Sequence, residues 1–334
     1  MSIDWTPLAD LIETHDRFLV TTHVRPDGDA LGSEVGMAGL LRQKGKDVRV
    51  VNSSRTPDRY DFLDPDGSLF EHFSDAKVAT LSDREVVVIL DLSAWSQLGD
   101  MAGWVRGFSG PRVVVDHHVS QDDLGATFLK DTSAEATGTL VVRAIRALGG
   151  AITKEVATGL LTAIATDTGW FRHPNTTPET LRTAAELVEA GAEIDRIHRL
   201  LFERNTTKRL LLLGETLAGL KTDAGGRVAY ATVTLDDLAR TGAGPQDTED
   251  LVDYTVSIAG VDVGILFVQL KRGGVKVSAR SRNGLDCAKL LSEFGGGGHK
   301  AAAGATLPDP VADSIGRVLA SVRRTLAEGD APGR

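Results

Sequence analysis

Three apolar, valine-rich runs in the first half of the chain constrain its fold more than any other feature. They are FLVTTH (18–23), EVVVILD (85–91) and RVVVDHH (112–118), and each ends in a carboxylate or an imidazole. Continuous apolar runs of this kind are typical of parallel strands that helices cover on both faces. The first run, a helix predicted over 30–45 and a strand predicted over 47–52 form one β-α-β unit. The sequence therefore predicts an α/β fold class, with a doubly wound parallel sheet in the N-terminal domain.

The length and the change of pattern along the chain predict a second domain. A chain of 334 residues is more than one hydrophobic core usually organises. From residue 225 the pattern becomes β-rich, and VDVGILFVQL and VKVSARSR form a predicted hairpin around KRGG. Helices are predicted before it, over 133–148, 153–168, 178–192 and a long stretch at 194–220, and after it over 309–328. We predict a first domain over 1–195, a helical linker over 196–224 and a smaller α+β domain over 225–330.

Charge and cysteine content exclude several classes of protein. The chain has 37 Lys and Arg against 46 Asp and Glu, a net charge of −9, which argues against a broadly basic surface that coats long nucleic acid. The single cysteine, Cys287, excludes an internal disulfide and fits a reducing compartment. No basic leader region and no apolar run of about 18 residues is present. We expect a cytoplasmic protein with no membrane contact.

Acidic and histidine side chains follow the predicted strands at the edge where parallel sheets bind ligands. The spacing His23-x3-Asp27-x-Asp29 leaves the first strand and enters a helix. Other strands end in Asp91 and in the run Asp116-His117-His118, and Asp167 interrupts the apolar run LLTAIATDTGW. Each acid alone could be an N-cap or a loop residue. Because a buried carboxylate is costly unless it is paired or metal-bound, the whole set predicts a metal site.

The kinds of ligand indicate which metal and which chemistry to expect. Mixed carboxylate and imidazole ligands suit Mn²⁺, Fe²⁺, Co²⁺ or Zn²⁺ better than Ca²⁺. About six ligands exceed what one ion takes while it keeps positions open for water, so we expect two ions roughly 3.5 to 4 Å apart with one bridging carboxylate. Such a pair activates a water and clamps phosphate oxygens during displacement. The implied reaction is phosphoester hydrolysis.

The second domain carries a basic segment that suits a small polyanion. Residues 265–300 hold seven Lys and Arg against two acids, and the rest of the chain carries −14. A solvated hairpin face would have the same composition. The glycines 295–298 would let backbone N–H groups approach a phosphate closely, although a flexible helix cap is the alternative. By contrast, Gly32, Gly36 and Gly39 favour close packing of a helix against the sheet, since a GxGxxG fingerprint is absent.

The order of these motifs resembles a known family. HVRPDGDALGS, Asp91, DHH at 116–118 and ATDTGWFRHPNTT are similar to the four motifs of the DHH phosphoesterases, and FGGGGHKAAAG at 294–304 is similar to the signature of the DHHA1 domain. The domain order and length resemble the nanoRNase and 3′-phosphoadenosine-5′-phosphate (pAp) phosphatase group. The resemblance implies a catalytic DHH domain, a DHHA1 domain that binds substrate, and two Mn²⁺ ions, with Mg²⁺ or Co²⁺ as substitutes.

The resemblance also implies a role for each motif residue. His23, Asp27 and Asp91 would hold one Mn²⁺, and Asp29, Asp91, His117 and Asp167 would hold the other. His118 would face the scissile phosphate, and Asp116 would orient the histidines, so that the catalytic residues are His118, Asp91 and Asp116. Substrate would be bound by a larger set: Arg280, Ser281, Gly296, Gly297, Gly298 and His299. Apart from the resemblance, Arg172 in FRHPNTT is a candidate for the cleft wall, with a surface salt bridge as the alternative.

The expected activity is Mn²⁺-dependent hydrolysis of short oligoribonucleotides, of linear dinucleotides such as pApA and pGpG, and of pAp to AMP. Long nucleic acid is not an expected partner, and a homodimer stays open. Hydrolysis of cyclic di-AMP as the main activity and RecJ-like exonuclease action are alternatives, although the chain has no room for extra nucleic-acid-binding domains. A pyrophosphatase would leave FGGGGH unexplained. A non-catalytic nucleotide sensor is the alternative outside the enzymes, and the intact metal ligands argue against it.

Overall fold

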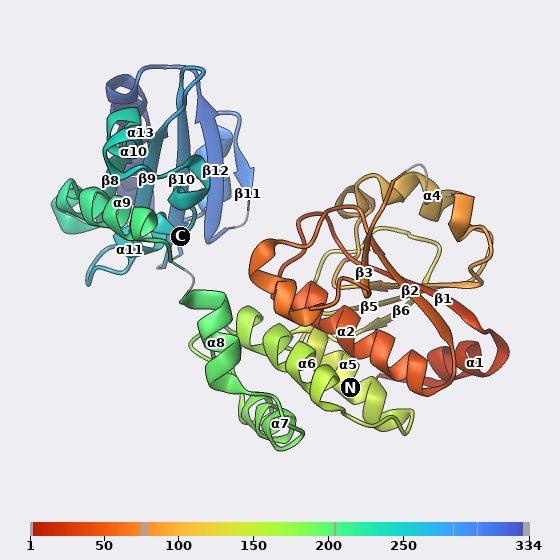
Figure 1. Cartoon of the computed structure of the whole chain (residues 1–334). Helices are drawn as coiled ribbons and strands as arrows, with labels where there is room; N and C mark the ends of the chain where they lie inside the picture. The colour runs from red at the N-terminus through yellow and green to blue at the C-terminus, as the bar shows by residue number, and fades with distance from the viewer. Residues whose placement is uncertain (1–2, 75–78, 204, 283, 299, 330–334) are drawn as a thin grey trace. The chain divides into compact units, whose positions relative to one another are not determined.

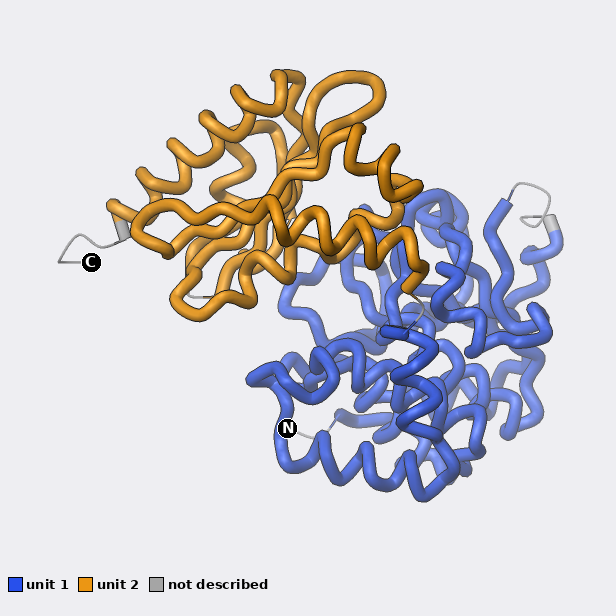
Figure 2. The backbone as a smooth tube through the Cα atoms, turned by 60° about the vertical axis from the view of Figure 1, so that its left-hand side comes forward, with its two compact units in different colours: residues 1–204 blue, residues 205–334 orange. Residues whose placement is uncertain are grey.

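The computed structural model describes residues 3–74, 79–203, 205–282, 284–298 and 300–329. The chain forms two compact units, residues 1–204 and 205–334, which Figure 2 shows in different colours. The division falls between α8 (Ile194–Phe202) and α9 (Thr207–Ala218), where the sequence suggested one long helical stretch. The domain limits at 195 and 225 stay predictions. Each unit is described here by itself.

Unit 1 is built on a six-stranded sheet with the order β3-β2-β1-β4-β5-β6, and every neighbouring pair is parallel. The strands are β1 (Arg17–Thr21), β2 (Asp47–Asn52), β3 (Phe70–His72), β4 (Val86–Leu90), β5 (Arg112–Asp116) and β6 (Thr127–Lys130). The chain winds in one direction from β1 to β3 and in the other from β4 to β6. In sheets of this kind ligands bind outside the carboxyl ends of the strands at the point of reversal, here β1 and β4.

Helices cover both faces of this sheet, as the valine-rich runs predicted. On one face Phe18, Val20 and Leu90 pack against α1 (Thr6–Thr14), α2 (Gly28–Gln43), α5 (Thr137–Ala147) and α6 (Lys154–Asp167), with α7 (Pro178–Glu189) beside them (Figure 1). On the other face Leu19 and Ile89 pack against α4 (Met101–Gly107) and the short 3-10 segments Ala79–Leu81 and Trp95–Leu98. The predicted doubly wound α/β domain is therefore confirmed.

Glycines bring α2 and α6 unusually close together. A Cβ atom at Gly32 would lie 2.1 Å from the Gly159 carbonyl oxygen, and one at Gly39 would lie 2.4 Å from Val156. At Gly36 the nearest atoms belong to Leu160 and to Val141 of α5. The prediction that these glycines pack a helix against the sheet is wrong, because their neighbours belong to helices.

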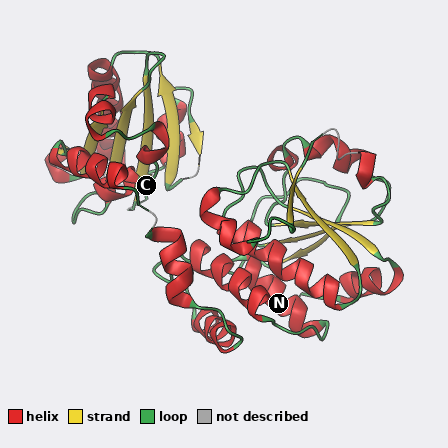
Figure 3. Cartoon of the chain, in the orientation of Figure 1, coloured by secondary structure: helices red, strands yellow, loops and turns green. Residues whose placement is uncertain are grey.

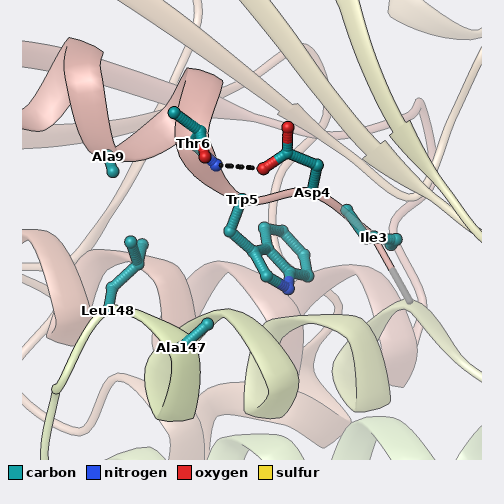
Figure 4. A pocket seen from close by; sticks show the side chains of 7 residues that line it. All are labelled: Ile3, Asp4, Trp5, Thr6, Ala9, Ala147 and Leu148. Atoms are coloured by element: carbon teal, nitrogen blue, oxygen red, sulfur yellow. Dashed lines mark hydrogen bonds between the residues drawn. The ribbon is translucent and has the colours of Figure 1, made fainter.

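The first residues of unit 1 are anchored by Trp5. Its side chain is buried in the same core as Leu8 and Ile12. It lies near Ala147 and Leu148 at the end of α5 (Figure 4). This contact attaches the N-terminal helix to α5.

Unit 2 contains a mixed sheet, whose strands are yellow in Figure 3. Its order is β11-β12-β10-β9-β8-β7, and among the described strands β8 and β9 pair in parallel while the other neighbours are antiparallel. The strands are β7 (Lys221–Asp223), β8 (Val228–Val233), β9 (Val263–Gln269), β10 (Val275–Ser281), β11 (Gly297–Gly298) and β12 (Ala302–Leu307). The hairpin predicted around KRGG is present as β9 and β10, and the Leu270 N–H donates to the Gly274 carbonyl oxygen at 3.0 Å.

Two groups of helices cover this second sheet. The helices α12 (Cys287–Ser292) and α13 (Val311–Gly329) pack on one face around Val277, Ile265 and Phe267. The helices α9, α10 (Leu235–Thr241) and α11 (Leu251–Val256) pack on the other face around Ala231 and Val268. The predicted smaller α+β domain is therefore confirmed. Among the helices of the described residues, none has the length and apolar character needed to cross a membrane.

Candidate metal centre

Six side chains that the sequence singled out meet beyond the carboxyl ends of β1, β4 and β5. His117 Nε2 lies 3.6 Å from Asp91 Oδ1, 3.7 Å from Asp29 Oδ2 and 3.7 Å from Asp167 Oδ2. His23 Nε2 lies 3.5 Å from Asp91 Oδ2 and 4.0 Å from Asp27 Oδ1. These distances are longer than hydrogen bonds, so the nitrogen and oxygen atoms face shared space instead of pairing closely with one another.

The ligand atoms form adjoining groups that suit divalent metals. One group is His23, Asp27 and Asp91, another is Asp29, His117 and Asp167, and a third joins Asp91, His117 and His118; the atoms within each group lie within 4.8 Å of one another. Asp91 and His117 each belong to two groups. Imidazole nitrogen and carboxylate oxygen together fit the first-row divalent transition metals, so the donor set agrees with the metal site expected from the sequence.

The first turn of α2 places two of the acids. Asp27 is the N-cap residue, and its Oδ1 accepts hydrogen bonds from the Asp29 N–H at 3.0 Å and the Ala30 N–H at 3.1 Å. Asp29 is 1% exposed and projects from this turn into the centre. The capping role and the ligand role of Asp27 are therefore compatible, because one carboxylate can cap the helix while it faces His23.

The start of α5 fixes Asp29, and sequence reasoning missed it. The Thr137 N–H donates to Asp29 Oδ2 at 2.7 Å, and the Gly138 N–H donates to Asp29 Oδ1 at 2.9 Å. The N-cap residue of α5, Ala136, supplies no capping side chain of its own. The available signal was the run AEATG, a helix start without a capping residue, whose free N–H groups needed an acceptor from elsewhere.

Asp91 has a backbone conformation that is rare for a residue with a side chain. Its φ is 59°, and its carboxylate is 2% exposed and accepts a hydrogen bond from Thr137 Oγ1 at 2.9 Å. Left-handed conformations of this kind cost about 1 to 3 kcal/mol and persist where the surrounding structure enforces them, often at functional sites. Thr137 therefore orients both buried carboxylates, Asp29 through its backbone and Asp91 through its hydroxyl.

Asp116 is fully buried and holds His118. Its Oδ1 lies 2.8 Å from His118 Nδ1, and its Oδ2 lies 3.0 Å from Lys130 Nζ and accepts a hydrogen bond from Ser93 Oγ. His117 Nδ1 faces the Ala134 carbonyl oxygen instead, at 3.2 Å, so Asp116 does not contact both rings. Lys130 escaped sequence reasoning because β6, which pairs it with Asp116, lacks the valine-rich pattern of the other strands.

Crowding and burial of the acids shift several pKa values. Burial raises the pKa of Asp29 well above its ordinary range, and the Asp91 and Asp167 carboxylates raise it further. Burial also raises the pKa of Asp167 to about 6. Burial disfavours the charged form of His23, but the Asp91 carboxylate outweighs this effect and raises the pKa of His23 to about 9. Several buried carboxyl groups that repel one another in this way favour the binding of a cation.

Asp116 and His118 shift in opposite directions because they are partners. Burial alone would raise the pKa of Asp116, but hydrogen bonds from His118, Ser93 and Lys130 hold it below its ordinary value. The same hydrogen bond with Asp116 raises the pKa of His118. The pair therefore favours an Asp116 carboxylate beside a His118 imidazolium.

The residues predicted to bind substrate differ from one another in the partners that the structure gives them. Arg280 Nε lies 3.1 Å from Asp253 Oδ1, an ionic partner that the sequence did not indicate. The Ser281 hydroxyl is buried and has no hydrogen-bond partner among the described residues. His299 lies outside the described residues. In unit 1, Arg172 is exposed, and its Nε donates to the Gly169 carbonyl oxygen at 2.8 Å.

The glycines before His299 have a structural reason as well as a predicted binding role. A Cβ atom at Gly296 would lie 2.3 Å from the Gly304 carbonyl oxygen, and one at Gly298, where φ is 146°, would lie 2.5 Å from the Ala302 carbonyl oxygen. At Gly297 nothing lies within 4 Å of that position. Close approach to β12 therefore requires glycine at two of the three positions, and the substrate role of all three stays a prediction.

Comparisons with known proteins agree with this fold and this set of residues. Residues 17–164 match the model of the DHH family, N-terminal domain, and residues 225–328 match the model of the DHHA1 domain. The chain belongs to the DHH family of phosphoesterases and carries a DHHA1 domain, so it is a hydrolase of phosphoric esters. The predicted family and enzyme class are confirmed.

Its relatives within the family include curated proteins that span nearly the same length. The chain is 36% identical over 310 residues to the bifunctional oligoribonuclease and PAP phosphatase NrnA of Thermus thermophilus, covering 92% of this chain and 89% of that protein. It is 26% identical over 329 residues to the protein of the same name from Bacillus subtilis, covering 97% and 99%.

Solved structures show the same architecture. The crystal structure of an exopolyphosphatase-related protein from Bacteroides fragilis is similar with a TM-score of 0.88 and 25% identity, covering 97% of this chain and 95% of that one. The exonuclease RecJ bound to manganese shares the fold, with a TM-score of 0.55 and 15% identity over 98% of this chain and 95% of that chain.

Proposed function

We propose that this protein is a Mn²⁺-dependent phosphodiesterase and phosphatase that degrades short oligoribonucleotides and linear dinucleotides to mononucleotides and converts pAp to AMP. The observation that carries the proposal is the convergence of His23, Asp91 and His117 with three further carboxylates at the reversal point of the sheet. The similarity to the NrnA proteins supports the choice of substrate.

The metal ligands divide into two sets in this proposal. His23, Asp27 and Asp91 hold one cation, and Asp29, Asp91, His117 and Asp167 hold the other, so that Asp91 serves both. Bound cations of this kind supply a water of lowered pKa and stabilise the charge on phosphate oxygens. Thr137 keeps Asp91 and Asp29 in place through the hydrogen bonds described above.

His118 acts on the substrate in this proposal. Asp116 engages Nδ1 of the ring at 2.8 Å, so Nε2 is the ring nitrogen that would meet a phosphate oxygen. Lys130 and Ser93 hold the other oxygen of Asp116, which fixes the orientation of the carboxylate and therefore that of His118. His118 would therefore meet the phosphate with a fixed ring orientation.

The DHHA1 domain binds one end of the substrate. In this proposal Arg280, whose Nε lies 3.1 Å from Asp253 Oδ1, would bind a phosphate through its terminal guanidinium N–H groups, and Ser281 lies next to it on β10. We propose substrate-binding roles for the glycines 296–298 and His299 in this domain and, separately, for Arg172 in the catalytic domain. The net positive charge of residues 265–300 supports binding of an anionic end group.

The test is product analysis with purified protein and Mn²⁺, with Mg²⁺ and Co²⁺ in parallel. The substrates are pApA, pGpG, pAp, a five-nucleotide RNA and cyclic di-AMP, and products are separated by ion-exchange chromatography over time. Mononucleotides from the linear substrates and AMP from pAp are expected, and an Asp91→Asn variant serves as the inactive control. No product from any linear substrate contradicts the proposal, and faster turnover of cyclic di-AMP would favour that alternative.

A further inference from the structure

Glu34 is a buried carboxyl group that the proposed reaction does not use. It lies in the middle of α2 (Gly28–Gln43), and it is 0% exposed. A carboxyl group in such a place is costly unless hydrogen bonds compensate it. Its Oε1 atom has no hydrogen-bond partner among the described residues. The hydrogen bonds of its other oxygen atom, Oε2, therefore need an explanation.

Glu34 is connected by buried hydrogen bonds to Thr22, the residue that precedes His23. Its Oε2 accepts from Asn52 Nδ2 at 2.8 Å, and Asn52 Oδ1 accepts from the Thr22 N–H at 3.1 Å. Thr22 Oγ1 then donates to the Leu90 carbonyl oxygen at 2.8 Å. All of these residues are buried, and the most exposed of them, Asn52, is 2% exposed. The network therefore joins α2 to the ends of β2, β1 and β4.

The network ends directly beside two of the metal ligands. Thr22 precedes His23, and Leu90 precedes Asp91, which is the residue with the left-handed φ of 59°. A shift of the backbone at Thr22 or Leu90 would move a ligand atom, because His23 and Asp91 each follow a hydrogen-bonded residue of this network directly. The charges of His23 and Asp91 both act on Glu34, which also places it close behind the centre.

We propose that Glu34 is a positioning residue of the metal centre, which acts through Asn52 and Thr22 to fix the backbone that carries His23 and Asp91. This inference rests on the proposed function, because it assigns a role to Glu34 in that same centre. Burial raises the pKa of Glu34 to about 8, so the neutral acid is the main form at neutral pH and a glutamine can take its place as the acceptor. Groups that hydrogen-bond metal ligands directly typically change metal affinity by about 10- to 100-fold when they are removed, and this network acts one residue further back, so the lower end of that range is expected.

The experiment is calorimetric titration of the full, metal-free chain with Mn²⁺ alone. Glu34→Met and Asn52→Leu each remove one link, and each is expected to weaken Mn²⁺ binding by about tenfold or more. The double variant should bind Mn²⁺ with about the same affinity as the single variant that binds it less tightly, because both residues act along one path. Glu34→Gln keeps an acceptor for Asn52 and is expected to bind Mn²⁺ within about threefold of the wild type.

A matched control tests the loss of any buried polar group. Thr216 is buried in α9 of unit 2, and Thr216→Val should not change Mn²⁺ affinity. Wild-type affinity in folded Glu34→Met or Asn52→Leu would overturn the inference, and so would additive effects in the double variant. If Glu34→Met does not fold, Thr22→Val tests the last link, since it removes only the bond to the Leu90 carbonyl.

The titration contains no substrate, which separates this inference from the proposed function. A protein that binds Mn²⁺ as expected but hydrolyses none of the proposed substrates would contradict the function and leave the role of Glu34 intact. Conversely, if the protein is active but substitutions at Glu34 and Asn52 leave its Mn²⁺ affinity unchanged, only the inference is contradicted.

Discussion

The carboxylate of Asp29 accepts a 2.7 Å hydrogen bond from the backbone N–H of Thr137, which lies 108 positions further along the chain. This contact caps α5 with an acid from α2 and places the acid near the positive end of the helix dipole, where negative charge is stabilised. The same threonine holds Asp91 through its hydroxyl. Two proposed metal ligands from separate elements are therefore oriented by one residue.

Replacement of Asp91 by asparagine should remove hydrolysis without unfolding the protein. Asparagine has nearly the same shape, but it lacks the charge that the proposal assigns to both cation sets. A loss of about 1000-fold in kcat corresponds to about 4 kcal/mol. Steady-state kinetics on pApA with saturating Mn²⁺ measures the effect, and circular dichroism checks the fold. Turnover within tenfold of the wild type would contradict the two-cation proposal.

Thr137→Val should lower kcat more than it lowers stability. The variant removes the hydroxyl bond to Asp91 but keeps the backbone bond to Asp29. The loss of transition-state stabilisation should therefore be about 1 to 2 kcal/mol, which is roughly tenfold in kcat. Thr139→Val is the matched control, because Thr139 is buried in the same helix and its hydroxyl bonds Glu135 instead. Equal activity losses in the two variants would show that the effect comes from the helix and not from Asp91.

Lys130→Met should destabilise unit 1 strongly. The ammonium group is one of two partners of the fully buried Asp116, at 3.0 Å, beside His118 at 2.8 Å, and removal of one partner from a buried ion pair costs up to about 3 to 5 kcal/mol. Urea unfolding measures the change. Adding Asp116→Asn to the same chain should recover part of the lost stability, because the buried charge that Lys130 compensated is then gone. A double variant as unstable as Lys130→Met would show that packing, not charge, is responsible.

The stability of the metal-free protein should fall as the pH rises through the neutral range, in part because of Glu34. Burial raises the pKa of this group from 4.5 in its ordinary state to about 8 in the fold. Between these values the unfolded chain has released the proton and the folded chain retains it, so a rise in pH favours unfolding, by up to about 5 kcal/mol in total.

Urea unfolding in EDTA at several pH values between about 5 and 8 tests this dependence. Glu34→Gln cannot titrate, so its stability should fall less steeply with pH than that of the wild type. The difference between the two curves isolates Glu34 from the other acids of the centre. Parallel curves would mean that Glu34 is ionised in the folded protein at neutral pH.

Alanine substitutions at neighbouring glycines should separate structure from substrate binding in unit 2. Gly296→Ala places a methyl group against the Gly304 carbonyl oxygen and should cost about 1 to 3 kcal/mol of stability. Gly297→Ala meets no atom within 4 Å, so its stability should change by less than about 0.5 kcal/mol. Unfolding curves of both variants give the comparison. A raised KM for pApA in the stable Gly297→Ala variant would support the proposed phosphate subsite, and an unchanged KM would count against it.

The convergence of the proposed ligands at the strand ends was predictable from the sequence because two strong signals coincide. Valine-rich runs mark the buried strands, and a parallel sheet brings their carboxyl ends to one edge, so His23, Asp91 and His117 could be grouped without coordinates. Glu34 could not, because a glutamate within a helix ordinarily indicates a solvent-facing side chain. Its burial depends on the packing of α2 between the sheet and α6, which no local pattern records.

The prediction of one continuous helical stretch over 194–220 was wrong for a related reason. It is interrupted between α8 and α9, and α9 begins after Thr206, whose side chain accepts a hydrogen bond from the Arg209 N–H at 3.1 Å. The capping residue was visible in the sequence, but the apolar residues on both sides of it suggested continuity. Local capping chemistry therefore determined a boundary that the hydrophobic pattern obscured.

The glycine contact between α2 and α6 has a consequence for how this enzyme tolerates change. Asp29 lies in the first turn of α2 and Asp167 in the last turn of α6, and Gly32 meets the backbone of Gly159 between them. Any side chain at either glycine must push the two helices apart, and with them the two acids. In a random library screened for hydrolysis, many inactive clones should therefore carry substitutions at these two glycines, although neither touches a reactant. The positions of the two acids depend on a helix contact that only glycine permits.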